Sequence, residues 1–96
     1  MFIVSLTYTC DIKQIEHHLA AHIEYLEHQY EAGNFLISGR KNPRIGGVII
    51  AIANSVKELQ VILATDPFKI NNLADYEITE FIPSKTTPEL VALLGL

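Results

Sequence analysis

The stretch GGVIIAIA, residues 46–53, decides how the rest of the chain must fold. Two glycines open it, and Val48 to Ala53 is an unbroken apolar run of strand length, far too short to cross a bilayer. A continuous apolar run is typical of a central strand that is covered on both faces. We therefore expect the flanking segments to pack around this strand.

Two strands and a long helix are predicted before the central run. Residues 2–8 (FIVSLTY) show the alternation of a strand that is covered on one face. Asp11 is in position to cap a helix that ends near Ala32. Residues 35–38 are predicted to form a second strand, and residues 40–45 a polar loop that leads into the central one.

Another helix and a last strand are predicted after the central run. Ser55 begins a capping box, the signature of a helix start. Asp66 before Pro67 predicts a second, short helical turn, because aspartate suits the cap and proline the first helical position. Residues 75–82 alternate again. A tail helix over residues 89–94 has too much leucine to be left wholly in water.

This order of elements is that of an α+β fold, the ferredoxin-like split βαβ arrangement with two helices on one face of an antiparallel sheet. The length suits a single domain over residues 1–96. The helices cover one face only, whereas the apolar central strand predicts cover on both. We therefore expect a homodimer that packs sheet to sheet.

The charge balance narrows the class of partner. The net charge is −4, and the only basic cluster is Arg40, Lys41 and Arg44, so nucleic acid is not expected as a partner. The single cysteine, Cys10, cannot form an intramolecular disulfide, and no signal peptide or membrane span is recognisable. We expect a cytoplasmic protein.

All four histidines lie on the predicted first helix. Its apolar stripe consists of Ile12, Ile15, Leu19, Ile23, Leu26 and Tyr30. His22 falls in the middle of this stripe, whereas His17 and His28 project from the opposite side and His18 lies on the flank. His17 and His28 are therefore predicted to be surface residues.

His22 allows three interpretations. It can be a core histidine whose ring is satisfied by a backbone carbonyl. It can pair with His18 on a zinc ion, but Leu19 stands where the glutamate of such motifs is found, and no third ligand follows; we expect no metal and no cofactor. It can also be a general base, because imidazole exchanges protons near neutral pH.

Asp66 is the candidate partner of His22, because the two predicted helices lie side by side on the sheet; a helix cap explains it equally well. The candidates for substrate contact are Ser38, Gly39, Arg40 and Phe68. A turn also explains Gly39. Arg40, like Arg44, is either an anion-binding residue or a solvated loop residue.

A set of short motifs, in order along the chain, resembles the YCII-related proteins. They are AHIEYL (21–26), Gly33, Ser38-Gly39, GGVI (46–49), DPF (66–68) and YEI (76–78). The resemblance implies a dimeric α+β barrel in which His22 and Asp66 form the proposed catalytic pair, and some relatives are linked to dehydrohalogenation of hydroxylated rings. Many relatives have an arginine where this chain has Leu19 and a proline where it has Arg40, so an anion-binding role would pass to Arg40 or Arg44.

The leading hypothesis is a cofactor-independent enzyme for elimination or isomerisation. His22 would take a proton from a small cyclic or hydroxylated aromatic substrate and Asp66 would orient the ring, in a cavity lined by Tyr8, Phe35 and Phe68. The rival is a non-catalytic dimeric module that binds a small ligand or a protein. An open cavity where His22 and Asp66 meet favours the enzyme.

Overall fold

The computed structural model describes all of residues 1–96. Its elements are β1 (Phe2–Tyr8), α1 (Ile12–Glu31), β2 (Phe35–Arg40), β3 (Gly46–Ala51), α2 (Val56–Leu63), α3 (Pro67–Ile70), β4 (Ala74–Glu80) and a 3₁₀ helix, η1 (Pro88–Leu93). The four strands form one antiparallel sheet in the order β2-β3-β1-β4. The predicted ferredoxin-like α+β fold is confirmed.

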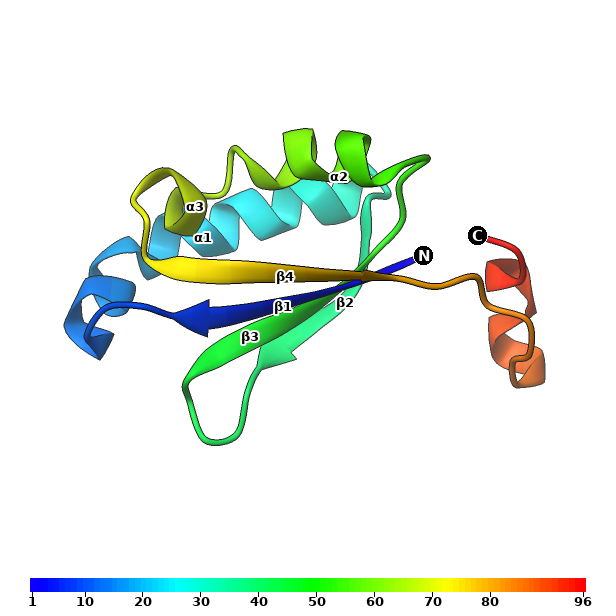
Figure 1. Ribbon diagram of the computed structural model, residues 1–96, viewed down its shortest axis with the longest axis horizontal. Coiled ribbons are helices and arrows are strands. Elements are labelled where there is room, and N and C mark those ends of the chain that lie inside the picture. The colour runs from blue at the N-terminus through cyan, green and yellow to red at the C-terminus, as the bar shows by residue number, and fades with distance from the viewer.

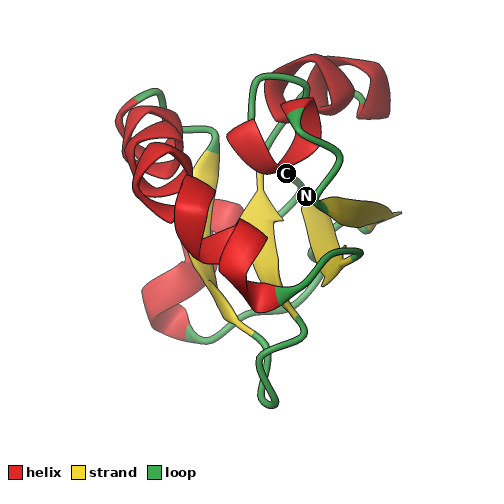
Figure 2. Ribbon diagram, turned by 90° about the vertical axis from the view of Figure 1, so that its left-hand side faces the viewer, coloured by secondary structure: helices red, strands yellow, loops and turns green.

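The helices α1, α2 and α3 lie together on one side of the sheet, and the tail that carries η1 extends from one end of it (Figure 1 and Figure 2). Alternate residues of β1, namely Phe2, Val4 and Leu6, are buried on this side. Val4 lies opposite Ile49 of β3, which is also buried. The alternation along residues 2–8 thus produces the core between sheet and helices.

The other face of the sheet carries no helix (Figure 1). Ile3 pairs with Ile50 on that face, and both side chains are partly exposed. Ile37 of β2 lies opposite Ile50 and is 63% exposed. Central β3 therefore has apolar side chains on both faces, as predicted, but the chain itself covers only one of them.

The predicted helix starts are confirmed by their caps. The side chain of Asp11 accepts a hydrogen bond from the Gln14 backbone N–H at 3.2 Å, and that of Ser55 accepts one from Glu58 at 3.1 Å. These bonds satisfy amide groups that have no partner within the helix. The first cap fixes where α1 begins, and hence which residues of α1 lie over the sheet.

Two predictions about α1 and β2 are corrected. The buried face of α1 is centred on Ile15 and Tyr25, whereas Ile23 is 45% exposed. Tyr25 belongs to this face, and its hydroxyl donates to the carbonyl of Ile62 at 2.8 Å, which links the face to α2. In addition, β2 continues through Arg40, which was predicted to begin a loop.

The C-terminal tail also differs from the prediction. Residues 88–93 form a 3₁₀ helix with no buried residue, and Leu90 is 50% exposed, so the expected burial of the leucines is wrong for the single chain. The N-terminal ammonium donates to the carbonyl of Phe81 at 3.0 Å and to that of Leu96, which holds the tail near the start of β1. No helix combines the length and apolar character that crossing a membrane would require.

Candidate active site

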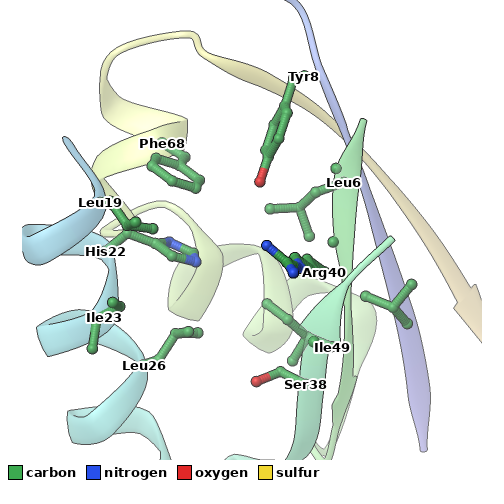
Figure 3. Close-up of a pocket in the computed structure, with 14 residues that line it drawn as sticks. Leu6, Tyr8, Leu19, His22, Ile23, Leu26, Ser38, Arg40, Ile49 and Phe68 are labelled. Carbon is green, nitrogen blue, oxygen red and sulfur yellow. The ribbon is translucent and has the colours of Figure 1, made fainter. Parts of the chain in front are cut away.

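A cavity of about 180 Å³ lies between the helices α1 and α3 on one side and the strands β1, β3 and β2 on the other. Figure 3 shows its walls. Most of the lining is apolar, and includes Leu6, Leu19, Ile23, Leu26 and Ile49. Such a lining around a few polar groups is the usual composition of a small-molecule site.

His22 lines this cavity and is bonded to Asp66 behind it, although the two residues are 44 positions apart in the chain. The imidazole Nδ1 of His22 lies 2.8 Å from Oδ1 of Asp66. Asp66 is completely buried, whereas the His22 side chain is 12% exposed and lines the cavity. The condition that favours an enzyme over a binding module, a His–Asp pair at an open cavity, is therefore present.

The carboxylate of Asp66 is held by two further bonds. Its Oδ1 accepts from the backbone N–H of Phe68 at 3.0 Å, the helix cap that the sequence predicts. Its Oδ2 accepts from the hydroxyl of Tyr76 on β4 at 2.5 Å. With three donors around it, the carboxylate cannot rotate away from His22, and its burial is compensated by hydrogen bonds.

The buried tyrosines around Asp66 stay protonated. Burial, followed by the negative charge of Asp66 and the hydrogen bond to it, raises the pKa of Tyr76 far above the ordinary value. Burial and the same charge raise the pKa of Tyr25. The Tyr76 hydroxyl is therefore protonated at neutral pH and donates to Asp66.

The bond to Asp66 also fixes the state of the His22 ring. A carboxylate offers only acceptors, so the hydrogen in this bond belongs to Nδ1, and the neutral ring keeps its free lone pair on Nε2. Phe68 stacks on the imidazole, with ring centroids 3.9 Å apart and planes 5° from parallel. Figure 3 shows the far edge of the ring directed into the cavity. Nε2 is thus the basic atom that a ligand would meet.

The opposite wall comes from β2. Ser38 lies opposite Ile49 and Arg40 opposite Gly47, so both project to the helix side of the sheet, while Gly39 contributes backbone to the lining. In Figure 3, the guanidinium of Arg40 points into the cavity from the side that faces His22. The structure therefore brings Ser38, Gly39, Arg40 and Phe68 to the same cavity as His22, and Asp66 lies behind His22.

The family model of the YCII-related domain matches residues 1–82. The chain belongs to the YCII-related family. A search of curated proteins gives no significant match.

Among solved structures, the fold is similar to that of 5-chloro-2-hydroxyhydroquinone dehydrochlorinase (TftG) from Burkholderia phenoliruptrix, determined in complex with 2,5-dihydroxybenzoquinone. The TM-score is 0.69, with 18% sequence identity over 84% of this chain and 93% of the other. At this level of identity, the likeness concerns the fold.

Some residues predicted for the site of this YCII-related chain lie elsewhere. Phe35 is buried in the core against Tyr25, with ring centroids 6.0 Å apart, and does not line the cavity, so that prediction is wrong. Arg44 pairs with Glu16 at 3.4 Å. His17 and His28 are exposed, as predicted.

The alternative in which His18 and His22 bind a zinc ion can be compared with the positions of the two rings. His18 packs edge-on against His17, with centroids 5.0 Å apart, while Nδ1 of His22 is engaged by Asp66. No group of three or more His, Cys, Asp or Glu side chains is placed to hold a metal ion. The i, i+4 spacing of the two histidines thus has no further ligand beside it.

Tyr76 is the member of the site that sequence reasoning missed. Its alternation with Glu77 predicts that it faces the core, and it lies opposite Leu6 of β1. Nothing in the local pattern indicates that its hydroxyl reaches Asp66. A buried aspartate with an oxygen left over after capping is the one signal that could have prompted a search for a donor on β4.

The first glycine of the GGVI motif leaves room for the close approach of β1 and β3. A Cβ added at Gly46 would lie 1.8 Å from the carbonyl oxygen of Leu6. No other residue type fits there without a shift of the backbone. By contrast, a Cβ at Gly39 would meet nothing within 4 Å.

Proposed function

We propose that this protein is a small acid–base enzyme that catalyses elimination or isomerisation on a cyclic or hydroxylated aromatic substrate. The observation that carries the proposal is the imidazole of His22, anchored through Nδ1 to a buried, fully bonded Asp66, with its other edge facing the cavity. An oriented base beside a substrate-sized cavity is the arrangement that proton abstraction needs.

In the first step of such a reaction, Nε2 of His22 takes a proton from a substrate hydroxyl. The resulting imidazolium is stabilised by the charge of Asp66, 2.8 Å away. His22 then returns the proton to a ring carbon, which gives a keto tautomer. Return of the proton to a different atom from the one it left is an isomerisation, and it needs no electron acceptor.

An elimination adds one more transfer. If the ring carbon that receives the proton carries chlorine, removal of a second hydroxyl proton lets the oxygen electron pair form a carbonyl while chloride leaves with its bonding pair. The net change is the loss of HCl, and a trihydroxychlorobenzene becomes a hydroxyquinone. The fold neighbour is a dehydrochlorinase of a substrate of this kind, which supports elimination as the first reaction to test.

The test is chloride release from 5-chloro-2-hydroxyhydroquinone, together with the isomerisation of α-angelica lactone to its conjugated isomer. His22→Gln should lower kcat by about 10²–10⁴-fold, the usual contribution of a general base. The matched control is His28→Gln on the exposed side of α1, which should stay within about twofold. Wild-type rates in His22→Gln, or no reaction of either substrate with the wild type, would contradict the proposal and favour a binding module.

We also propose that two copies pack through the open sheet face and that the protein works in the cytoplasm. The partly exposed Ile3, Val48 and Ile50, with the exposed Ile37, form an apolar surface of the kind that homodimers cover. Cys10 is free, as in reducing compartments. Ile37→Lys should shift the mass measured by light scattering from dimer to monomer; a monomeric wild type would contradict the assembly.

A further inference from the structure

We infer that the cavity binds a planar molecule of one six-membered ring that carries an ionised oxygen, and that Arg40 binds this negative charge. The inference deepens the proposed function and rests on it for the role of His22. It concerns the substrate class and the part that Arg40 plays in recognising it.

The size of the cavity suits a ligand of one ring. A dry cavity of about 150 Å³ in another protein accommodates benzene, and this one measures about 180 Å³. That leaves room for a ring with a few small substituents. The walls provided by Leu6, Leu26, Ile49 and the aromatic Phe68 suit the flat apolar faces of such a ring.

The charge inside the cavity is positive. Neither of the two ion pairs of the chain involves Arg40, so its guanidinium has no carboxylate partner. Its neighbours on the hairpin are engaged: Lys41 donates to the Thr7 hydroxyl at 3.2 Å, and Arg44 pairs with Glu16. No acidic side chain lines the cavity, and Asp66 is completely buried behind His22 and already has three donors.

The concentration of charge at the cavity mouth agrees with an anionic ligand. Arg40, Lys41 and Arg44 lie within five residues and make up three of the seven basic residues of a chain whose net charge is −4. These three residues border a common depression on the surface beside the cavity. A local positive potential on an acidic protein draws small anions toward its opening.

The positions of His22 and Arg40 on opposite walls determine how the ligand is oriented in the cavity. His22 faces the cavity from α1 and Arg40 faces it from β2, with the hydroxyl of Tyr8 also pointing in between them (Figure 3). A ring between them has its acidic proton at Nε2 and its ionised oxygen at the guanidinium. Arg40 then also stabilises the negative charge that appears on the ring when His22 removes the proton.

The test compares the binding of a charged and a neutral ring by calorimetry. The charged probe is 2,5-dihydroxybenzoquinone, which is anionic at neutral pH, and the neutral probe is hydroquinone. Arg40→Gln should weaken binding of the charged probe about tenfold or more, because it removes a charge-assisted hydrogen bond, and should leave hydroquinone within about twofold. Arg40→Lys should fall between the two, since it keeps the charge but loses the planar fork.

The matched control is Arg44→Gln, which removes an equal charge four residues away from a side chain that does not line the cavity. It should change the affinity for the charged probe by about twofold or less. Equal losses in Arg40→Gln and Arg44→Gln would overturn the inference, as would a wild type that does not bind the charged probe or prefers hydroquinone.

The outcome is separable from that of the proposed function. His22→Gln leaves Arg40 in place, so it should still bind 2,5-dihydroxybenzoquinone while chloride release is lost. Arg40-dependent binding in a wild type that converts neither test substrate would retain the anion site and reject the enzyme. Chloride release that does not depend on Arg40 would retain the enzyme and reject the anion site.

Discussion

The two walls of the cavity differ in whether their polar groups are already bonded. We call the wall that carries His22 the helix wall and the wall that carries Arg40 the strand wall. On the helix wall, every polar group near His22 is engaged by another: Asp66 receives bonds from the imidazole, from the Phe68 N–H and from the Tyr76 hydroxyl. On the strand wall, Arg40 has no ion-pair partner. The first arrangement fixes one atom, Nε2, in position; the second leaves a charge free for a ligand. Substitution of the bonded groups around His22 should therefore reduce stability, whereas substitution of Arg40 should reduce binding.

The largest effect on stability is expected for Asp66→Ala. The substitution leaves three donors buried beside an empty space, and breaking a buried charged network costs about 3–5 kcal/mol. Asp66→Asn retains an acceptor and a similar shape, so its loss should be smaller. Urea unfolding measures both. A loss below about 1 kcal/mol in Asp66→Ala would mean that the helix wall is not held by this carboxylate.

A second prediction compares two glycines of the strand wall. Gly46→Ala should destabilise the protein by about 2–3 kcal/mol, because the new Cβ collides with the carbonyl oxygen of Leu6, which belongs to the backbone and cannot simply move aside. Gly39→Ala, where the Cβ meets nothing, should stay within about 0.5 kcal/mol. Equal values for the two in thermal or urea unfolding would contradict the close approach of β1 and β3.

Tyr76→Phe tests one bond of the helix wall and its dependence on pH. Loss of a hydrogen bond to a charged group should cost about 1.5–3 kcal/mol near neutral pH. Because the pKa of Tyr76 is raised by folding, the hydroxyl stays protonated in the folded state while it ionises in the unfolded state above its ordinary pKa of about 10. The folded state then holds more protons, so stability falls as the pH rises past that value.

The control is the slope with which the free energy of unfolding falls as the pH rises above about 10. Each tyrosine with a raised pKa contributes up to about 1.4 kcal/mol per pH unit, and two of them, Tyr25 and Tyr76, behave in this way. In Tyr76→Phe the fall above that pH should be about half as steep as in the wild type. An unchanged slope would show that the Tyr76 hydroxyl ionises equally in both states.

The smallest effect on stability is expected for Arg40→Gln. The guanidinium has no partner in the chain and is largely exposed, so the free energy of unfolding should change by less than about 0.5 kcal/mol. Measured beside Asp66→Ala, it sets the contrast between the two walls. A loss comparable to that of Asp66→Ala would mean that Arg40 holds the fold together.

The parts of this fold that follow from local patterns were predictable from the sequence. The alternation in residues 2–8 and the caps at Asp11, Ser55 and Asp66 depend on neighbours in the chain, and the structure has each of them. The contact between His22 and Asp66 was predictable only after the fold had been predicted, because the fold places the end of the second helix beside the first.

What sequence reasoning missed depends on tertiary contacts. The predicted loop at Arg40 is strand, because pairing with Gly47 extends β2 beyond its apolar residues, and this extension is what directs Arg40 into the cavity. Phe35 was expected at the cavity but lies in the core, because it begins β2 opposite Ala51, where its ring packs against that of Tyr25. Neither contact can be predicted from the residues that lie next to it in the sequence.

The central claim is that Asp66 holds His22 with the lone pair of Nε2 facing the cavity. The most direct measurement is ¹⁵N-resolved NMR of the imidazoles, at a pH where the rings are neutral, with the exposed His17 and His28 as internal references. We predict that His22 alone is locked with its hydrogen on Nδ1 and that the lock is lost in Asp66→Ala. A neutral His22 with its hydrogen on Nε2, or the same tautomer mixture as the exposed rings, would contradict the account.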